Sequence, residues 1–254
     1  MEYTTIQYTR LNTIGIITLN RPQALNAMDL VMRAELKDLF TKLKTDADTK
    51  VIIIKGNGRA FCAGGDINTM GTFKPNKGRA RLQNVHPLFK AIQEIDKPVI
   101  AAIQGPAAGN GFALACACDF RICADNSKFV TAFINLGLVP DCGTMYTLPR
   151  LVGLTKAKEL CMLSDKISAQ EALAIGLVNK VVPLNELEKA TLAFAERLAE
   201  HSELALGLMK NILNQTYDLP LTQLLDEEAL AQDICMSTDL HKEAVAHFLN
   251  KNKK

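Results

Sequence analysis

The sequence predicts an α/β fold that continues into a helical C-terminal module. Two short apolar runs, residues 51–54 and 99–103, each end in a turn of small residues that opens a helical pattern. Strands that alternate with helices in this way favour parallel pairing with right-handed crossovers. From residue 155 onward the pattern is mainly helical, apart from one edge strand expected at 177–182.

The spacing of apolar residues predicts the elements in chain order. Residues 15–20 form an apolar strand that Arg21-Pro22 ends, and residues 29–46 repeat apolar side chains at a helical period. Residues 72–81 are polar and contain Gly and Pro, which predicts a mobile loop. The other expected strands are 51–55, 99–103 and 119–124, and the other expected helices are 82–95, 109–118, 144–151, 156–163, 169–175, 187–201, 204–215, 221–237 and 240–249.

The composition is that of a globular chain and argues against several classes of partner. Hydrophobic residues make up 48% and charged residues 22%, and the net charge of +2 gives no basic footprint for nucleic acid. The absence of Trp also argues against a stacking platform for bases. No stretch approaches the roughly 20 apolar residues of a membrane helix, and no signal peptide is visible. We therefore expect neither a nucleic acid nor a membrane as partner.

The cysteines and histidines indicate a reducing compartment and no metal site. The seven cysteines are an odd number and lie mostly in apolar surroundings, which favours free thiols and a cytoplasmic location. Cys116 and Cys118 form a C-x-C pair without a second ligand pair nearby, and the four histidines lack metal-binding spacing. We expect no metal ion.

The two small-residue turns are the strongest functional signal. The first runs through residues 61–67 (Phe-Cys-Ala-Gly-Gly-Asp-Ile) and the second through 105–111 (Gly-Pro-Ala-Ala-Gly-Asn-Gly). Where Cβ atoms are missing, backbone N–H groups approach a ligand closely. Two such turns that face each other supply two donors to one oxygen. The pair predicts an oxyanion hole for a thioester carbonyl.

Four motifs in order, residues 20–28, 61–67, 105–111 and 137–141, resemble the crotonase (enoyl-CoA hydratase/isomerase) superfamily over essentially the whole chain. The resemblance implies a crotonase-type spiral of repeated ββα units, followed by a C-terminal helical module. It divides the chain into an α/β core with the acyl-CoA site (1–195) and a helical oligomerisation module (196–254). It further implies an acyl-CoA thioester substrate, no cofactor beyond the coenzyme A of that substrate, and a homotrimer or dimer of trimers.

The same resemblance assigns expected roles to residues. Gly65 and Asn110 match the two oxyanion donors. Ala113 and Phe133 stand where hydratases of the superfamily carry the two glutamates that handle water, and neither side chain transfers protons. Phe133 suits an acyl pocket and plain core packing about equally. The positions expected around coenzyme A and the acyl group are Ala24, Leu25, Ala27, Ala63, Asp66, Ile67, Gly109, Phe133 and Pro140.

Asp141 is the carboxylate that remains near the expected site. An aspartate before a helix commonly serves as an N-cap or turn residue. Several isomerases of the superfamily, however, carry a catalytic aspartate at this position. Residues 131–150 are especially similar to the ring-1,2-epoxyphenylacetyl-CoA isomerases of phenylacetate catabolism, although Asn110 replaces a usual small residue and Thr144 a common glycine.

These observations favour an acyl-CoA isomerase in which Asp141 is acid and base. It would shift a double bond, or rearrange a ring epoxide, through an enolate that the oxyanion hole stabilises. One alternative is a hydratase-type lyase of fatty acid or aromatic acid degradation, and dehalogenase or decarboxylase chemistry of the same superfamily also stays open. A second alternative is a non-catalytic acyl-CoA-binding protein.

Overall fold

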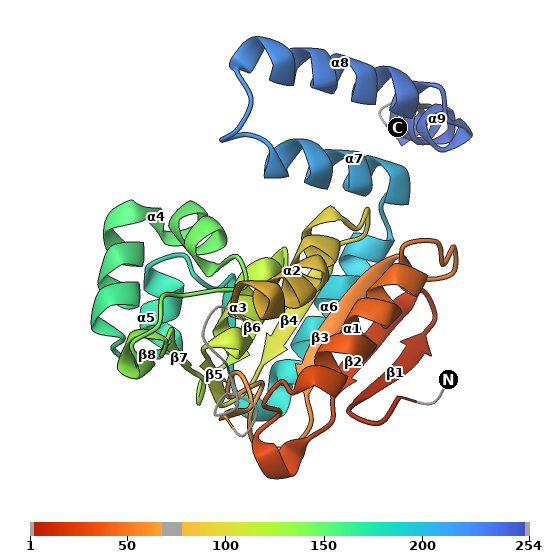
Figure 1. The fold of residues 1–254 in the computed structure, drawn as a ribbon. Coiled ribbons are helices and arrows are strands. Elements are labelled where there is room, and N and C mark those ends of the chain that lie inside the picture. The colour runs from red at the N-terminus through yellow and green to blue at the C-terminus, as the bar shows by residue number, and fades with distance from the viewer. Residues whose placement is uncertain (1–2, 68–77, 252–254) are drawn as a thin grey trace.

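The computed structural model describes residues 3–67 and 78–251, and it confirms the predicted α/β class (Figure 1). A six-stranded sheet has the strand order β1-β2-β3-β4-β6-β9. Its first pair, β1 and β2, is antiparallel, whereas β2, β3, β4, β6 and β9 pair in parallel. A second sheet with the order β5-β7-β8 begins directly after β4.

The elements have the following bounds. The strands are β1 (Ile6–Leu11), β2 (Ile14–Leu19), β3 (Val51–Gly56), β4 (Val99–Ile103), β5 (Pro106–Ala108), β6 (Phe120–Ala124), β7 (Lys128–Val130), β8 (Ile167–Ser168) and β9 (Lys180–Val182). The helices are α1 (Leu30–Leu43), α2 (Gly78–Glu94), α3 (Asn110–Ala117), α4 (Thr144–Leu163), α5 (Ala169–Ala174), α6 (Leu187–Ala199), α7 (Glu203–Asn214), α8 (Leu221–Met236) and α9 (Asp239–Lys251). Short 3-10 helices are η1 (Pro22–Ala24), η3 (Ile134–Leu136) and η4 (Leu184–Glu186).

The central strands are apolar throughout because helices cover both faces of the sheet. In β3, Ile52 and Ile54 join the large core that includes side chains of α1, α2 and α3. Val51 and Ile53 point to the other face and join a smaller core with Leu187 and other residues of α6. This two-sided burial accounts for the continuous apolar runs that mark β3 and β4 in the sequence.

The structure differs from the sequence-based elements where the signal is short or polar. β1 lies at the edge of the sheet with Ile6 as its one buried residue, so its alternation is weak. β5, β7 and β8 have only two or three residues each. Of the loop expected at 72–81, residues 72–77 lie outside the described residues, and α2 already begins at Gly78. The helices expected at 144–151 and 156–163 are the two parts of α4, which Gly153 interrupts at φ +76°.

The three C-terminal helices follow the sheet and its covering helices. Figure 1 shows α7 above the sheet, with α8 and α9 on the far side of α7. Large apolar side chains of α8 and α9 are exposed in the single chain, among them Leu221 and Phe248. None of the described helices is both long enough and apolar enough to cross a membrane. The division of the chain at residues 195 and 196 stays a prediction.

Candidate active site

The two small-residue turns lie side by side at the ends of the neighbouring parallel strands β3 and β4. The Cys62 N–H donates to the Pro106 carbonyl oxygen at 3.1 Å, and the Ala108 N–H donates to the Cys62 carbonyl oxygen at 3.0 Å. Cys62 and Ala107 form a parallel bridge between the turns. Backbone hydrogen bonds therefore fix the position of one turn against the other.

Glycines allow this close approach. Gly64 has φ +117° and Gly109 has φ +48°, a region that side-chain-bearing residues rarely adopt. A Cβ atom on Gly64 would lie 3.1 Å from the Ala108 carbonyl oxygen and 3.8 Å from the Asn110 nitrogen. A Cβ atom on Gly109 would lie 3.8 Å from the Gly64 Cα. The first turn thus passes directly over the start of α3.

The structure leaves two backbone donors at this crossing without an acceptor in the described part of the chain. They are the N–H groups of Gly65 and Asn110. Asn110 is the first residue of α3, after the N-cap Gly109, and the first N–H groups of a helix have no partner within the helix. The helix dipole adds partial positive charge at the same end. The crossing can therefore accept an oxygen that carries negative charge.

The loop after β2 lies against the first turn. The Ala63 N–H donates to the Leu25 carbonyl oxygen at 2.9 Å, and the Met28 N–H donates to the Gly64 carbonyl oxygen at 2.7 Å. The Asp66 N–H returns a bond to the Met28 carbonyl oxygen at 3.1 Å. The structure thus brings together two segments that were expected to contact coenzyme A, and the half-buried positions among them are Ala24, Leu25, Ala27 and Ala63.

Asp66 has a partner that sequence reasoning missed. The Arg21 guanidinium pairs with the Asp66 carboxylate at 2.9 Å and with Asp29 at 3.3 Å, and it donates to the Ala27 carbonyl oxygen at 2.5 Å. Arg21 thereby ties the loop after β2 to the first turn. Ile67, in contrast, is 69% exposed and free to meet a ligand. Arg21 lies in the motif at residues 20–28, which marks it as a residue of interest. Its pairing with Asp66 could not be predicted from that motif, because Asp66 lies 45 residues further along the chain.

Asp141 lies in the loop between η3 and α4, after the buried Pro140. Gly143 is the N-cap of α4, and no side chain caps this helix. The Asp141 carbonyl oxygen accepts bonds from the Thr144 N–H at 3.0 Å and the Thr144 hydroxyl at 2.7 Å. Its carboxylate oxygen Oδ1 is buried without a hydrogen-bond partner among the described residues. The backbone of Asp141 forms the turn, and the carboxylate is left available.

Neither residue 113 nor residue 133, where the resemblance leads us to expect the two glutamates of hydratases, is an acid. Ala113 is fully buried in α3, and Phe133 is 6% exposed at the start of η3. Phe133 is buried, yet it belongs to neither of the two core clusters. The nearby thiols are no substitute, because burial raises the pKa of Cys62 and of Cys116 to about 12. Both stay protonated at neutral pH and do not act as bases.

A cavity of about 300 Å³ adjoins the Asp141 loop. His86 and Phe89 of α2 line one side, and Cys142, Gly143 and the start of α4 line the other. Phe89 is buried, whereas His86 is exposed at the edge of the cavity. The cavity thus begins one residue after Asp141 and offers an apolar wall to a ligand.

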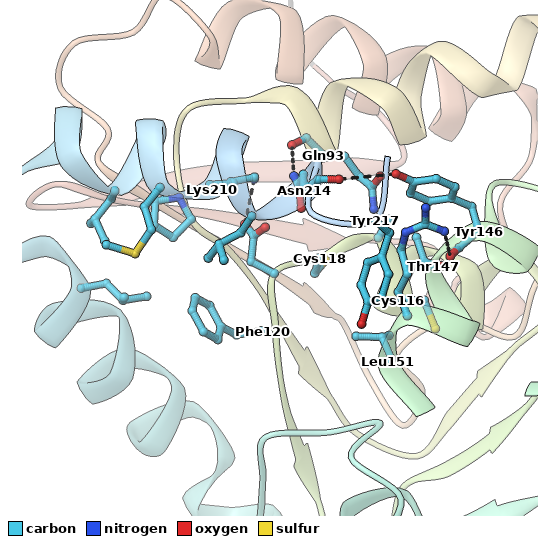
Figure 2. A pocket seen from close by; sticks show the side chains of 18 residues that line it. Gln93, Cys116, Cys118, Phe120, Tyr146, Thr147, Leu151, Lys210, Asn214 and Tyr217 are labelled. Carbon is cyan, nitrogen blue, oxygen red and sulfur yellow. Dashed lines mark hydrogen bonds and ion pairs between the residues drawn. The ribbon is translucent and has the colours of Figure 1, made fainter. Parts of the chain in front are cut away.

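A second cavity, of about 360 Å³, lies where α3, α4 and α7 meet (Figure 2). It shares four lining residues with the first cavity, namely Gln93, Ala117, Tyr146 and Thr147. The Tyr146 hydroxyl donates to Asp218 at 2.8 Å, and the Arg150 guanidinium stacks on the Tyr146 ring at 3.5 Å. The two cavities therefore have one wall in common, and Arg150 and Asp218 hold its Tyr146 ring in place.

The described residues contain no group of three or more His, Cys, Asp or Glu side chains that is arranged to hold a metal ion. Among the described residues, the site offers backbone donors at the crossing of the turns, the Asp141 carboxylate and apolar walls.

A sequence model described as enoyl-CoA hydratase/isomerase matches residues 9–254. The chain belongs to this family. A crotonyl-CoA hydratase from Syntrophomonas wolfei is 37% identical over 100% of this chain and 98% of the relative. A 1,2-epoxyphenylacetyl-CoA isomerase from Escherichia coli is 35% identical over 92% of this chain and 91% of the relative. An enoyl-CoA hydratase structure from Bacillus anthracis superposes with a TM-score of 0.94 at 32% identity, covering 98% of this chain and 97% of the other.

These likenesses confirm the superfamily and the crotonase-type fold that the motifs predicted. The protein is an enzyme of the enoyl-CoA hydratase/isomerase superfamily. They do not single out the epoxide isomerases, since relatives named as hydratases are 37% and 33% identical to this chain and the epoxide isomerase is 35% identical. The choice between isomerase and hydratase therefore depends on the residues of this site.

Proposed function

We propose that the protein is an acyl-CoA isomerase that shifts a double bond along the acyl group, with Asp141 as the acid and base. The observation that carries the proposal is the Asp141 carboxylate, whose Oδ1 is buried without a described partner beside an apolar cavity. A carboxylate without a structural role is available for proton transfer.

The reaction needs one proton carrier and one anion site. On a 3-enoyl thioester, Asp141 takes the proton from C2, and the electron pair moves toward the thioester oxygen. The N–H groups of Gly65 and Asn110 stabilise the resulting dienolate oxygen. Asp141 then returns the proton at C4, so that the double bond lies between C2 and C3. The proton that leaves is the proton that returns, and no other reactant is consumed. Rearrangement of a ring epoxide through the same enolate is the second form of this proposal.

Hydration places a greater demand on the site. Water must be deprotonated as it attacks C3, and a proton must be delivered to C2. Ala113 and Phe133 provide no group for either task, and the buried thiols of Cys62 and Cys116 stay protonated. One aspartate would have to perform both tasks. Isomerisation needs only one proton-transferring group, so the residues of this site favour isomerisation over hydration.

The second candidate function is that of an enoyl-CoA hydratase. The observation in its favour comes from two relatives at 37% and 33% identity, each matched over at least 97% of its own length. They are named crotonyl-CoA hydratase and short-chain-enoyl-CoA hydratase. On this alternative, Asp141 would activate the water alone.

The test compares two reactions on the purified protein. Isomerisation of 3-hexenoyl-CoA and hydration of crotonyl-CoA are followed by absorbance for the wild type, Asp141→Asn and Asp125→Asn. Asp125 is an exposed aspartate in the turn after β6 and serves as the matched control. Isomerisation should dominate, and Asp141→Asn should lower its kcat by about 10²–10⁴-fold. Dominant hydration that survives Asp141→Asn would contradict the proposal, and no turnover of either substrate would favour a non-catalytic acyl-CoA-binding protein.

We also propose that the chain works as a homotrimer or a dimer of trimers. The support is the apolar surface of the last two helices, where Leu221, Leu225, Leu230, Leu240 and Phe248 are each more than half exposed in the single chain. Exposed apolar surface of this extent is typical of an interface. Light scattering after size-exclusion chromatography measures the assembly, and a monomeric mass would contradict this proposal.

A further inference from the structure

Asn110 carries a side chain at the point where α3 begins, and that side chain is almost completely buried. The residue is 3% exposed. Buried amide groups are nearly always hydrogen-bonded, because an unpaired one loses its bonds to water. The Asn110 side-chain nitrogen Nδ2 contacts the Cys142 sulfur Sγ at 3.5 Å, within reach of a hydrogen bond to sulfur. The amide therefore reaches the residue that follows Asp141.

Cys142 holds an unusual place in the Asp141 loop. It is 2% exposed and has φ +55°, in the left-handed region that a side-chain-bearing residue seldom adopts. Gly143 follows with φ +78°, so two consecutive residues turn the chain the same way. Such a conformation persists only where its surroundings hold it. One restraint is the pair of bonds from Thr144 to the Asp141 carbonyl oxygen, and the Asn110 amide on Sγ is a second.

We propose that Asn110 is a positioning residue for Asp141. Its side-chain amide, through Cys142 Sγ, fixes the Asp141 loop against the start of α3. The inference rests on the proposed function, in which the Asn110 N–H stabilises the enolate oxygen and Asp141 moves the proton. One residue then sets both ends of the reaction, since its backbone holds the charge and its side chain holds the base at a constant distance from it. A small residue at this position has no group that reaches the loop.

Three variants separate the side chain from the backbone. Asn110→Ala keeps the N–H donor and removes the amide. Cys142→Ala removes the sulfur that accepts the bond, whereas Cys142→Ser keeps an acceptor in a similar place. Cys161→Ala, near the C-terminal end of α4, is the control for loss of a thiol. The measurements are kcat and KM for 3-hexenoyl-CoA, the Kd of the unreactive hexanoyl-CoA, and the melting temperature.

Asn110→Ala and Cys142→Ala should each lower kcat by about tenfold or more. The rate of proton transfer falls steeply when the Asp141 carboxylate is displaced slightly from its position beside the substrate. The Kd of hexanoyl-CoA should change little, since the oxyanion donors remain. Cys142→Ser should keep more of the kcat than Cys142→Ala, and the double variant Asn110→Ala/Cys142→Ala should be no worse than the poorer single variant.

The inference is overturned if Asn110→Ala keeps the wild-type kcat. It is also overturned if kcat and the melting temperature fall while the Kd of hexanoyl-CoA rises, without any advantage of serine over alanine at 142, since that pattern indicates general loss of structure. The proposed function fails separately. If Asp141→Asn retains isomerisation, Asp141 is not the proton carrier. If Asp141→Asn abolishes isomerisation while Asn110→Ala leaves it intact, only the positioning role is wrong.

Discussion

Replacing Lys210 by methionine should destabilise the protein, because this lysine joins α7 to the sheet. Its ammonium group donates to the Ile92 and Lys97 carbonyl oxygens at 3.0 Å each and pairs with Asp119 Oδ2 at 2.8 Å. Lys210 is 8% exposed, and the Asp119 side chain is 18% exposed. Methionine keeps the length of the side chain and supplies no donor, so two carbonyl groups and a carboxylate lose their partner.

Loss of one partner from a buried ion pair costs about 3–5 kcal/mol. Asp119 keeps the Val99 N–H at 2.7 Å and some contact with solvent, which puts the expected loss of unfolding free energy at the lower end, about 3 kcal/mol. Burial raises the pKa of Asp119, and Lys210 opposes the rise. A carboxyl whose pKa folding raises destabilises the fold as the pH increases through that pKa. The deficit of the variant should therefore be smallest in acid and grow toward neutral pH.

Urea unfolding at one fixed protein concentration measures this difference, since assembly makes apparent stability depend on concentration. Lys90→Met is the matched control. Lys90 pairs with Glu94 at 3.4 Å on the surface of α2, with both side chains more than half exposed, and its loss should cost no more than about 1 kcal/mol. The reasoning is refuted if Lys210→Met costs no more than Lys90→Met, or if its deficit does not change with pH.

Two further predictions concern stability. Gly111→Ala should lower the melting temperature and cost about 1–3 kcal/mol of unfolding free energy, because the added Cβ atom would lie 2.1 Å from the Cys62 carbonyl oxygen. Gly78→Ala is the control, since a Cβ atom there would meet nothing within 4 Å. Equal melting temperatures of the two variants would contradict the prediction. Glu35→Gln should cost about 1–2 kcal/mol at neutral pH. Burial raises the pKa of Glu35, but bonds from the N–H and hydroxyl groups of residues 4–5 outweigh it and lower that pKa, so the stabilisation is lost as the pH falls through the lowered value. Urea unfolding over a pH series should show the deficit shrinking in acid, and a constant deficit would refute it.

The sequence predicted the central part of the fold because its signals are local. β3 and β4 are continuous apolar runs. Each is followed by a turn that contains glycines, because a Cβ atom at these positions would come too close to the other turn. The edge strand β1 was missed since it buries Ile6 alone. β8 was missed because two residues carry no period. Elements that depend on long-range pairing leave little trace in a single sequence.

In the candidate site, too, features that depend on local sequence were predictable, and contacts between distant residues were not. The crossing of the two turns was predictable, because backbone N–H groups near Gly65 and Asn110 depend only on loop shape. The pairing of Arg21 with Asp66 and the contact of the Asn110 amide with Cys142 were not, since each joins residues more than 30 positions apart. Nor did the sequence show that the helix after Asp141 is capped by Gly143, which is what leaves the carboxylate available.

On the function proposed above, charge stabilisation and proton transfer depend on different segments of the chain. The backbone donors lie on turns that are packed so tightly that a Cβ on Gly111 would meet the Cys62 carbonyl oxygen, and such turns tolerate little change. The Asp141 loop instead follows an exposed stretch, in which Leu138 is 45% and Val139 is 70% exposed. On the function proposed above, substitutions in this loop alter which protons move while the anion site stays the same. One fold can then hold hydratases and isomerases that share an oxyanion hole and differ in where the carboxylates stand.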